Sequence, residues 1–327
     1  MQICIFGAGA VGSHFAVRLA LAGHDVSCVM RGPHLEAVKA NGLTLRVGDA
    51  EFSAKVRASD DPAALGPQDV VISTLKANGL SSLAAGLAPL LRDHTAVVFA
   101  QNGIPWWYDL GLPADQPSPP DLSFLDPGGA LRAAVSQARI VGGVIFSSNE
   151  IVAPGIVVND SPERNMLLVG ECDDRASERI QRLRSALDGA LIQSPQVARI
   201  RETIWTKLIS NMSVSVLCML TAKTARAAVA DPALQDVVSR MLDEAQSIAR
   251  SCYSDATRRS GAAPNHRPSL LQDYERGRPM EIDSLVRAPQ AFARAAELST
   301  PTLDVMAALA IQHARDRGLY QSKTSSE

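Results

Sequence analysis

The sequence feature that most constrains this chain is a glycine-rich stretch within its first twelve residues. A short apolar run, 3–6, leads into a G-x-G-x-x-G pattern, and an apolar, alanine-rich segment, 15–20, follows. The pattern comprises Gly7, Ala8, Gly9, Ala10, Val11 and Gly12. Strand, glycine turn and helix in this order let the backbone approach a pyrophosphate and direct helix N–H groups at it. The order therefore predicts a dinucleotide-binding site, with a glycine-rich turn that binds nothing as the alternative.

The residue after the second expected strand bears on the identity of the dinucleotide. Residues 25–30 have a strand pattern that ends at Arg31. In NAD-binding versions of this arrangement an Asp or Glu near this point accepts the ribose 2′-hydroxyl. A guanidinium instead pairs with a 2′-phosphate, which a carboxylate would repel. Arg31 therefore predicts NADP as the cofactor, and the alternative is a solvated arginine that closes a strand.

The rest of the N-terminal half alternates strand and helix patterns, which is typical of an α/β fold with an open sheet. We expect strands at 43–47, 51–56, 69–75, 96–100, 140–146, 151–158 and 165–170, and helices at 35–40, 80–91 and 176–191. The first two of these strands are expected to form a hairpin, and the last two to extend the sheet. Lys76 and Asn102 each follow a buried-type strand, and ligands of open α/β sheets lie beyond the carboxyl ends of strands. Both are therefore candidate site residues, with loop capping as the alternative for each.

A proline-rich stretch, 105–129, interrupts this pattern and begins with Trp106, Trp107 and Tyr108 close together. Its low periodicity predicts an insertion or a lid near the mouth of a site. The sequence leaves open whether the aromatic side chains cover a pocket or bury an interface.

The composition changes near residue 195, and almost everything from Arg199 onward has helical periodicity. We expect helices at 199–222, 231–252, 268–275, 281–298 and 301–316. The predicted organisation is therefore a dinucleotide-binding domain over 1–195 and an all-helical domain over 196–320. A polar tail, 321–327, is expected to fray.

The first of these helices carries a polar stripe on an otherwise apolar sequence. Lys207, Asn211 and Ser215 are spaced i, i+4, i+8 and so share one face of a continuous helix. A buried polar stripe needs partners or a ligand. Desolvation would lower the pKa of a lysine there toward the range that is useful for proton transfer. The alternative is that Lys207 forms a structural ion pair with a buried carboxylate.

Charge and residue usage exclude several classes of function. The net charge is −2, so no overall basic field predicts a nucleic-acid partner or an anionic membrane. The weakly charged stretch 3–22 contains His14, Arg18 and the motif glycines, which argue against a membrane span. Five scattered cysteines without a C-x-x-C pair predict neither disulfides nor zinc, and they fit a reducing cytoplasm. The six histidines show no metal-ligand spacing and are interpreted as surface or capping residues, so no metal is implied.

Six short motifs occur in one order along the chain, from about residue 1 to 316. They are Gly7–Gly12, Thr74-Leu75-Lys76-Ala77, Gln101-Asn102-Gly103, Trp205-Thr206-Lys207-Leu208 with Asn211, Ser269-Leu270-Leu271-Gln272-Asp273 and Glu281-Ile282-Asp283. Each motif is only modestly specific. Together, in this order and spacing, they resemble the ketopantoate reductase (2-dehydropantoate 2-reductase) family.

This resemblance implies an N-terminal Rossmann domain, a C-terminal helical domain of the 6-phosphogluconate dehydrogenase type, and an active site in the cleft between them. The implied reaction is the NADPH-dependent reduction of a 2-oxo acid, above all of 2-dehydropantoate to (R)-pantoate in pantothenate biosynthesis. By the same resemblance Lys207 is the general acid and Glu281 its acidic partner. The implied substrate-binding residues are Asn102, Asn211, Ser215 and Ser269, and the implied cofactor contacts beyond the glycine motif are Arg31, Lys76 and Asn102. A homodimer is plausible on the resemblance alone.

One position departs from the family pattern. The family often has a second asparagine one turn after Asn211, where this chain has Ser215, and a hydroxyl cannot make the paired contacts of an amide. The segment 105–129 is also longer than in the shortest members. The exact 2-oxo acid therefore stays open. The alternatives are a reductase of a different 2-oxo acid on the same scaffold and an NADP-binding sensor without catalysis.

Overall fold

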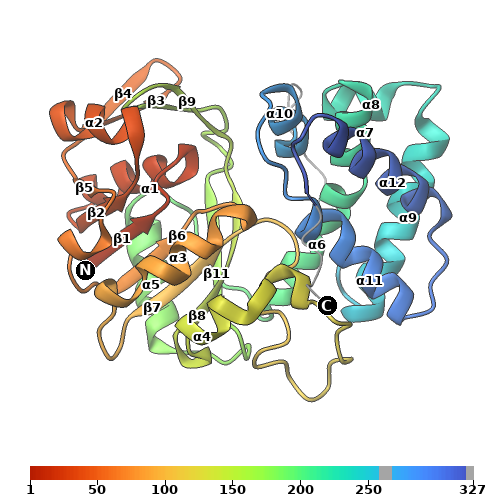
Figure 1. The fold of residues 1–327 in the computed structure, drawn as a ribbon, viewed down its shortest axis with the longest axis horizontal. Helices are drawn as coiled ribbons and strands as arrows, with labels where there is room; N and C mark the ends of the chain where they lie inside the picture. The colour runs from red at the N-terminus through yellow and green to blue at the C-terminus, as the bar shows by residue number, and fades with distance from the viewer. Residues whose placement is uncertain (258–266, 322–327) are drawn as a thin grey trace. The chain divides into compact units, whose positions relative to one another are not determined.

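The computed structural model describes residues 1–257 and 267–321, and it divides the chain into two compact units (Figure 1). The first unit comprises Met1–Gln101 and Ala130–Ile200, and the second comprises Asn102–Gly129 and the chain from Arg201 onward. The predicted boundary at residue 195 lies close to the second crossover between the units. It does not anticipate that the segment 102–129 packs with the helical unit. Residues 322–327 of the predicted polar tail lie outside the described residues.

The first unit is built on a seven-stranded sheet. In spatial order its strands are β11 (Met166–Glu171), β8 (Ile140–Phe146), β7 (Ala96–Ala100), β6 (Val70–Ser73), β1 (Gln2–Phe6), β2 (Asp25–Val29) and β5 (Arg57–Ser59). All neighbouring pairs are parallel except β11 with β8. The central strands are buried on both faces, as expected for the continuous apolar runs that the sequence shows there. The predicted α/β class is confirmed.

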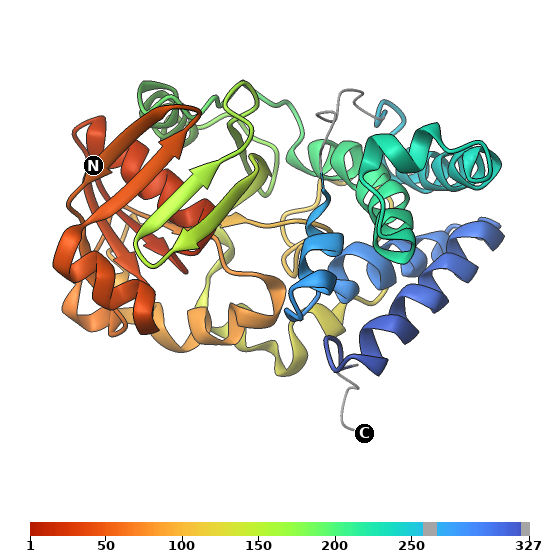
Figure 2. The same cartoon turned by 90° about the horizontal axis from the view of Figure 1, so that it is seen from above.

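A second, four-stranded sheet corrects one expectation. It contains β4 (Ala50–Ala54), β3 (Leu43–Val47), β10 (Ile156–Asn159) and β9 (Asn149–Ala153), in that order. The predicted hairpin is β3–β4, but 151–158 does not extend the main sheet. A turn divides it into β9 and β10, which pair with each other, and β10 also pairs with β3 (Figure 2). The turn forms because Pro154-Gly155 interrupts the run, with Gly155 at a φ of +78°.

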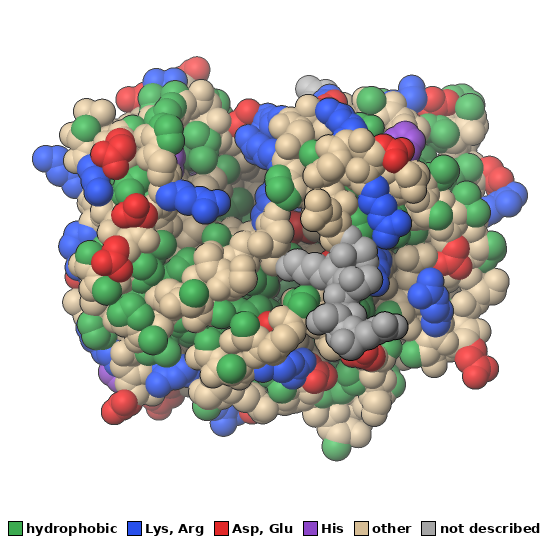
Figure 3. Space-filling view, viewed as in Figure 1, with side chains coloured by type: hydrophobic (Ala, Val, Ile, Leu, Met, Phe, Trp, Pro, Cys, Tyr) green, Lys and Arg blue, Asp and Glu red, His purple; other side chains and the backbone are tan. Residues whose placement is uncertain are grey.

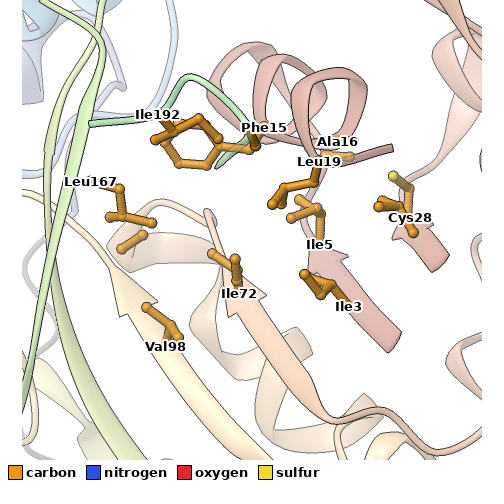
Figure 4. Close-up of a cluster of buried hydrophobic side chains, with 14 of the residues drawn as sticks. Ile3, Ile5, Phe15, Ala16, Leu19, Cys28, Ile72, Val98, Leu167 and Ile192 are labelled. Atoms are coloured by element: carbon orange, nitrogen blue, oxygen red, sulfur yellow. The ribbon is translucent and has the colours of Figure 1, made fainter. Parts of the chain in front are cut away.

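Helix α1 (Ala10–Leu21) lies between these two sheets and contacts strands of both. On one side Phe15 and Leu19 pack onto Ile5 and Ile72 of the main sheet, forming the fully buried core that Figure 4 shows. On the other side α1 contacts β3, β4, β9 and β10. The helix is therefore buried on two faces, which explains its nearly uniform apolar composition.

The first unit contains four further α-helices among the described residues: α2 (Gly32–Asn41), α3 (Leu80–Gly86), α4 (Ala130–Ala134) and α5 (Glu178–Gly189). The predicted helix over 80–91 ends early, at Gly86, and a single 3₁₀ turn, Ala88–Leu90, follows. Pro89 explains the break, because proline lacks the N–H that an α-helix interior needs. Ser177 is the N-cap of α5, and its hydroxyl accepts a hydrogen bond from the Ile180 N–H.

The second unit is helical, as predicted. Its helices are α6 (Ile200–Met212), α7 (Val214–Thr221), α8 (Ala225–Ala230), α9 (Gln235–Cys252), α10 (Ser269–Glu275), α11 (Ala288–Ala295) and α12 (Pro301–Asp316). A π-helical segment, Asp283–Arg287, leads into α11, and we call it the π turn. The expected single helix over 199–222 is wrong in one respect, because Ser213 leaves helical geometry at φ −109°, ψ −85° and separates α6 from α7. Among the described helices, only the stretch Ile200–Thr221 is long and apolar enough to cross a membrane, and 67% of its most apolar window is buried within the fold.

The aromatic residues near the start of the segment 105–129 lie in the core of the second unit. Trp106, Trp107 and Tyr108 are all at most 2% exposed. The Tyr108 hydroxyl accepts a hydrogen bond of 2.8 Å from Trp205 Nε1, and the Tyr108 carbonyl accepts one of 2.7 Å from the buried guanidinium of Arg201. The aromatic side chains therefore fasten this segment to α6 rather than forming a solvent-facing lid.

Candidate active site

The three motif glycines, which lie from the end of β1 into the first turn of α1, are explained in different ways. Gly7 has a φ of +87°, and a Cβ there would lie 2.4 Å from the Leu75 side chain. A Cβ on Gly12 would lie 2.5 Å from Thr74 Oγ1 and 2.8 Å from the Ile5 side chain, so this glycine permits close packing of helix on sheet. Thr74 also donates a hydrogen bond of 2.8 Å to the Gly7 carbonyl, which fixes the turn.

Gly9 differs, because the protein itself does not require a glycine there. Its φ of −77° suits any residue, and the nearest atom to an added Cβ is the Gly7 carbonyl oxygen at 3.8 Å. Helix α1 starts at the next residue without a side-chain cap and without an acidic residue in its first turn. An open glycine at an uncapped helix N-terminus is what a close-lying phosphate requires. The loop therefore fits the pyrophosphate of a dinucleotide.

A short hydrogen-bond chain that sequence reasoning missed supports this loop from behind. His34 Nδ1 accepts a hydrogen bond of 3.0 Å from the Gly155 N–H, so Nε2 carries the proton and lies 3.0 Å from the Ser13 hydroxyl. Ser13 in turn donates to the Ala8 carbonyl at 3.0 Å. Burial lowers the pKa of His34, which keeps it in the neutral form that this chain needs. The loop, α1, α2 and the β9–β10 turn are thus connected.

The two basic candidates of the first unit lie at neighbouring strand ends. Arg31 follows β2 directly before α2, is exposed, and has no ion-pair partner among residues 1–257 and 267–321. Lys76 follows β6 and precedes a 3₁₀ turn, Ala77–Gly79. Because β2 and β6 flank β1 in the sheet, both residues and the glycine loop lie at the carboxyl edge of three adjacent strands. On the face that Figure 3 shows, acidic and basic side chains are interspersed.

In the second unit the structure brings Lys207 and Asn102 into direct contact. Lys207 Nζ, on α6, donates a hydrogen bond of 2.6 Å to Asn102 Oδ1. Asn102 is held in turn by its neighbours: Gly103 has a φ of +79° and lies so close to the π turn that a Cβ would be 2.4 Å from the Ser284 carbonyl oxygen. The same oxygen accepts a hydrogen bond of 2.9 Å from the Ile104 N–H. The contact orients the ammonium group toward a fixed amide oxygen.

The other two residues of the predicted polar stripe lie on different helices. Asn211 lies one turn after Lys207 on α6, and both side chains are half-buried. Ser215 lies beyond the helix break, is buried, and donates a hydrogen bond of 3.4 Å to the Ser210 carbonyl. The prediction that Ser215 shares one continuous helix face with Lys207 is therefore wrong, because Ser213 interrupts the helix between them.

The other two candidates of this unit lie at the starts of helical segments. Glu281 precedes the π turn and is 6% exposed, and its carbonyl accepts a hydrogen bond from the Leu285 N–H. Ser269 is the exposed first residue of α10, a helix that packs against α7.

No cluster of three or more potential metal ligands occurs within the described parts of the chain. The interpretation of the histidines as surface or capping residues is wrong for His14, which is 1% exposed and lies 2.6 Å, through Nδ1, from Asn149 Oδ1. Burial lowers its pKa to about 4. His266 lies outside the described residues.

Comparison with known proteins identifies similar chains over nearly the whole length. Residues 3–107 match a family model described as Ketopantoate reductase PanE/ApbA, and residues 199–314 match one described as Ketopantoate reductase PanE/ApbA C terminal. A 2-dehydropantoate 2-reductase of Mesorhizobium japonicum is 41% identical, over 98% of this chain and 100% of that protein. The crystal structure of 2-dehydropantoate 2-reductase from Geobacter metallireducens GS-15 is 25% identical, with a TM-score of 0.79 over 95% of this chain and 99% of the other. A D-mandelate dehydrogenase, solved with NADH and anilino(oxo)acetate, shares the fold at a TM-score of 0.79 and 19% identity, over 98% and 100% of the two chains.

Proposed function

Because this chain belongs to the ketopantoate reductase family, we propose that it reduces the ketone of 2-dehydropantoate to give (R)-pantoate, with NADPH as the hydride donor. The chain is an oxidoreductase of the 2-dehydropantoate 2-reductase type, and its family uses a nicotinamide cofactor on a small-molecule substrate. The observation that carries the proposal is the hydrogen bond from Lys207 Nζ to Asn102 Oδ1, because it orients the ammonium group that would donate the proton.

Lys207 acts as the general acid in this proposal. A bound reduced nicotinamide supplies the hydride that forms the new C–H bond at C2 of the substrate. Negative charge then develops on the ketone oxygen, and the Lys207 ammonium stabilises it and transfers one proton to it. Asn102 holds the ammonium through one of its three N–H donors, which fixes the direction of the others.

The polar residues near Lys207 bind the substrate in this proposal. Asn211, one helical turn away, and Ser269 hold polar groups of the 2-oxo acid, and Glu281 is the acidic partner in the same pocket. We do not assign a substrate contact to Ser215, because its hydroxyl is directed at the backbone of α6, at the Ser210 carbonyl. Because the proposal contains no substrate contact from Ser215, other 2-oxo acids should be tested beside 2-dehydropantoate.

The cofactor is NADP rather than NAD in this proposal. The loop Gly7–Gly12 receives the pyrophosphate, and Arg31 and Lys76 balance phosphate charge at the neighbouring strand ends. Support comes from the exposed Arg31 at the end of β2, where a carboxylate would serve NAD. We further propose a cytoplasmic location, supported by five buried free thiols, and a homodimer, supported by family membership alone.

The test follows the absorbance of reduced nicotinamide with NADPH and a panel of 2-oxo acids. Turnover with 2-dehydropantoate far above the others is the expected result. Faster turnover with another 2-oxo acid would keep the reaction and change the substrate. Binding of NADPH without turnover of any 2-oxo acid would contradict the enzymatic proposal and favour a sensor.

A further inference from the structure

We propose that Tyr320 is a positioning residue for the reductase site: with Asp283 and Arg287 it holds the π turn, and through that turn it holds Asn102 against Lys207. The inference rests on the proposed function for its kinetic consequence. The three side chains are called the C-terminal clamp below.

The clamp is a closed set of hydrogen bonds between the end of the described chain and the π turn. The Tyr320 hydroxyl donates to Asp283 Oδ1 at 2.6 Å, and Arg287 donates to the same oxygen at 2.8 Å. Arg287 also donates to the Tyr320 hydroxyl oxygen at 3.1 Å. Beside them, the Leu319 carbonyl accepts a hydrogen bond of 2.9 Å from the Met280 N–H. Leu319 and Tyr320 are thereby tied to Met280 and Asp283, on the two sides of Glu281.

The π turn needs such support because π-helical geometry is rare and occurs mostly as single turns. In this protein the turn presents the Ser284 carbonyl to the Ile104 N–H, with Gly103 allowing the close approach. Two residues before Ile104, the Asn102 side chain accepts the hydrogen bond from Lys207. Arg287 adds a second connection to the same segment, since its guanidinium lies 4.9 Å from the ring centre of Phe124.

The pKa values of Tyr320 and Arg287 indicate that the clamp does not act as a pH-dependent switch near neutral pH. Burial, together with the adjacent Asp283 carboxylate, raises the pKa of Tyr320, so its hydroxyl remains a donor at neutral pH. Burial acts to lower the pKa of Arg287, but the hydrogen bonds to Asp283 and Tyr320 outweigh it and raise the pKa. Tyr320 and Arg287 therefore each keep one protonation state around neutral pH.

The kinetic test is Tyr320→Phe in the full chain. It removes the hydroxyl and keeps the ring, so we expect kcat/KM for the 2-oxo acid to fall about 10-fold, as when a reacting group is held less firmly. The Kd for NADPH should stay unchanged. Tyr274→Phe is the matched control, because Tyr274 lies in the same unit and its hydroxyl, within the described parts of the chain, makes only an exposed contact of 3.5 Å with His313. Unchanged kinetics of folded Tyr320→Phe, with only a lower Tm, would reduce Tyr320 to a structural residue and overturn the proposal.

A second measurement does not depend on turnover. Hydrogen exchange of the Ile104 amide and of 283–287 should be faster in Tyr320→Phe than in the wild type and the Tyr274→Phe control. Equal exchange at these amides would overturn the proposal. Asp283→Asn, which weakens the acceptor of the clamp hydrogen bonds from Tyr320 and Arg287, provides the same readout if Tyr320→Phe does not fold. If the wild type turns over no 2-oxo acid, the proposed function fails, while the exchange result still decides whether the clamp holds the Asn102 segment.

Discussion

The glycine loop of the first unit and the Lys207 site of the second are built in opposite ways. The loop is one contiguous stretch, Gly7–Gly12, and its shape is set by backbone geometry and by the absence of side chains. The Lys207 site joins Lys207 and Asn102 from two separate segments, and our proposals add Glu281 and a supporting segment near Tyr320. Its shape is set by side-chain hydrogen bonds over long sequence separations.

This difference has a consequence for substitutions. In the loop, an added methyl group either collides with the protein or enters the space for the ligand, so steric substitutions are informative there. In the Lys207 site, removing a donor or acceptor changes how a reacting group is held while the backbone remains in place. The two regions should therefore respond to different kinds of variants and in different measurements.

The largest expected effect is on the chemistry of the helical unit. Lys207→Ala removes the proposed general acid, so kcat should fall by about 10²–10⁴-fold, the usual contribution of such proton transfer. The Kd for NADPH should change little, because the loop is in the other unit. Steady-state kinetics and a cofactor titration measure the two quantities.

Lys223→Ala is the matched control for this prediction. Lys223 lies in the same unit, and its exposed side chain forms an ion pair of 3.2 Å with Asp231. Such surface pairs contribute little to stability, so kcat should stay at the wild-type value. Near-normal turnover of Lys207→Ala itself would show that another group donates the proton.

The next prediction distinguishes Gly9 from Gly7, two glycines of the same loop. In Gly9→Ala the new Cβ meets no protein atom closer than 3.8 Å, so the free energy of unfolding should hardly change. The Cβ would occupy the space proposed for the pyrophosphate, and a misfit of one methyl group costs about 1–3 kcal/mol. The Kd for NADPH should therefore rise by about 5–150-fold, which a fluorescence titration of the folded variant measures.

Gly7→Ala should behave in the opposite way. Its φ of +87° and the Leu75 side chain at 2.4 Å add strain and overlap within the protein. Together they should lower the free energy of unfolding by about 2–5 kcal/mol, as urea unfolding without cofactor would measure. If Gly9→Ala destabilised the protein as much as Gly7→Ala, the assignment of the open space to a ligand would be wrong.

The fold was predictable where the pattern is local. The central strands are continuous apolar runs, which is typical of parallel strands buried on both faces, and they lie where the sequence places them. The second sheet was not predictable, because the pairing of β10 with β3 joins residues more than a hundred positions apart. The break at Ser213 was also missed, since the residues around it keep helical periodicity and the Ser213 hydroxyl bonds back to the Ile209 carbonyl.

The residues of the two sites also differ in how far the sequence predicts their roles. The roles of Gly7 and Gly12 follow from a local motif with a known geometric purpose. The contact of Lys207 with Asn102 spans 105 positions, and no local pattern encodes it. Tyr320 drew no attention in the sequence, because a tyrosine near a polar tail has no signal until its partner Asp283 is in place.

The first unit also contains a network of side chains that are far apart in the sequence, centred on His14. His14 is buried beside Asn149 and Asn159, and its Nε2 has no hydrogen-bond partner among the described residues. Protonation would bury an unpaired N–H beside Arg18, so the folded pKa is lowered to about 4 from 6.5. Between these values the unfolded chain binds a proton that the folded chain does not. The free energy of unfolding should therefore fall as the pH drops below 6.5, by about 1.4 kcal/mol per pH unit.

His14→Gln isolates this contribution, because it keeps a polar group and removes the titration. Between pH 7 and pH 5 the wild type should lose about 2 kcal/mol more than the variant in urea unfolding, whereas carboxylate contributions cancel between the two. At pH 7 kcat should be the same in both proteins. An equal pH dependence of stability would show that His14 is not buried in its neutral form.

The smallest expected effect tests whether the first unit also uses a side chain to select its ligand. Arg31→Ala removes the exposed guanidinium at the end of β2, so the KM for NADPH should rise by about 10-fold, as for one charge-assisted contact of roughly 1.4 kcal/mol. The KM for NADH should not change, because NADH lacks the 2′-phosphate. Arg46→Ala is the control, since Arg46 is an exposed arginine of the same unit that pairs with Glu51 at 2.9 Å. Equal changes for both cofactors would mean that Arg31 supports the loop in general, and the first unit would then bind its ligand through backbone shape alone.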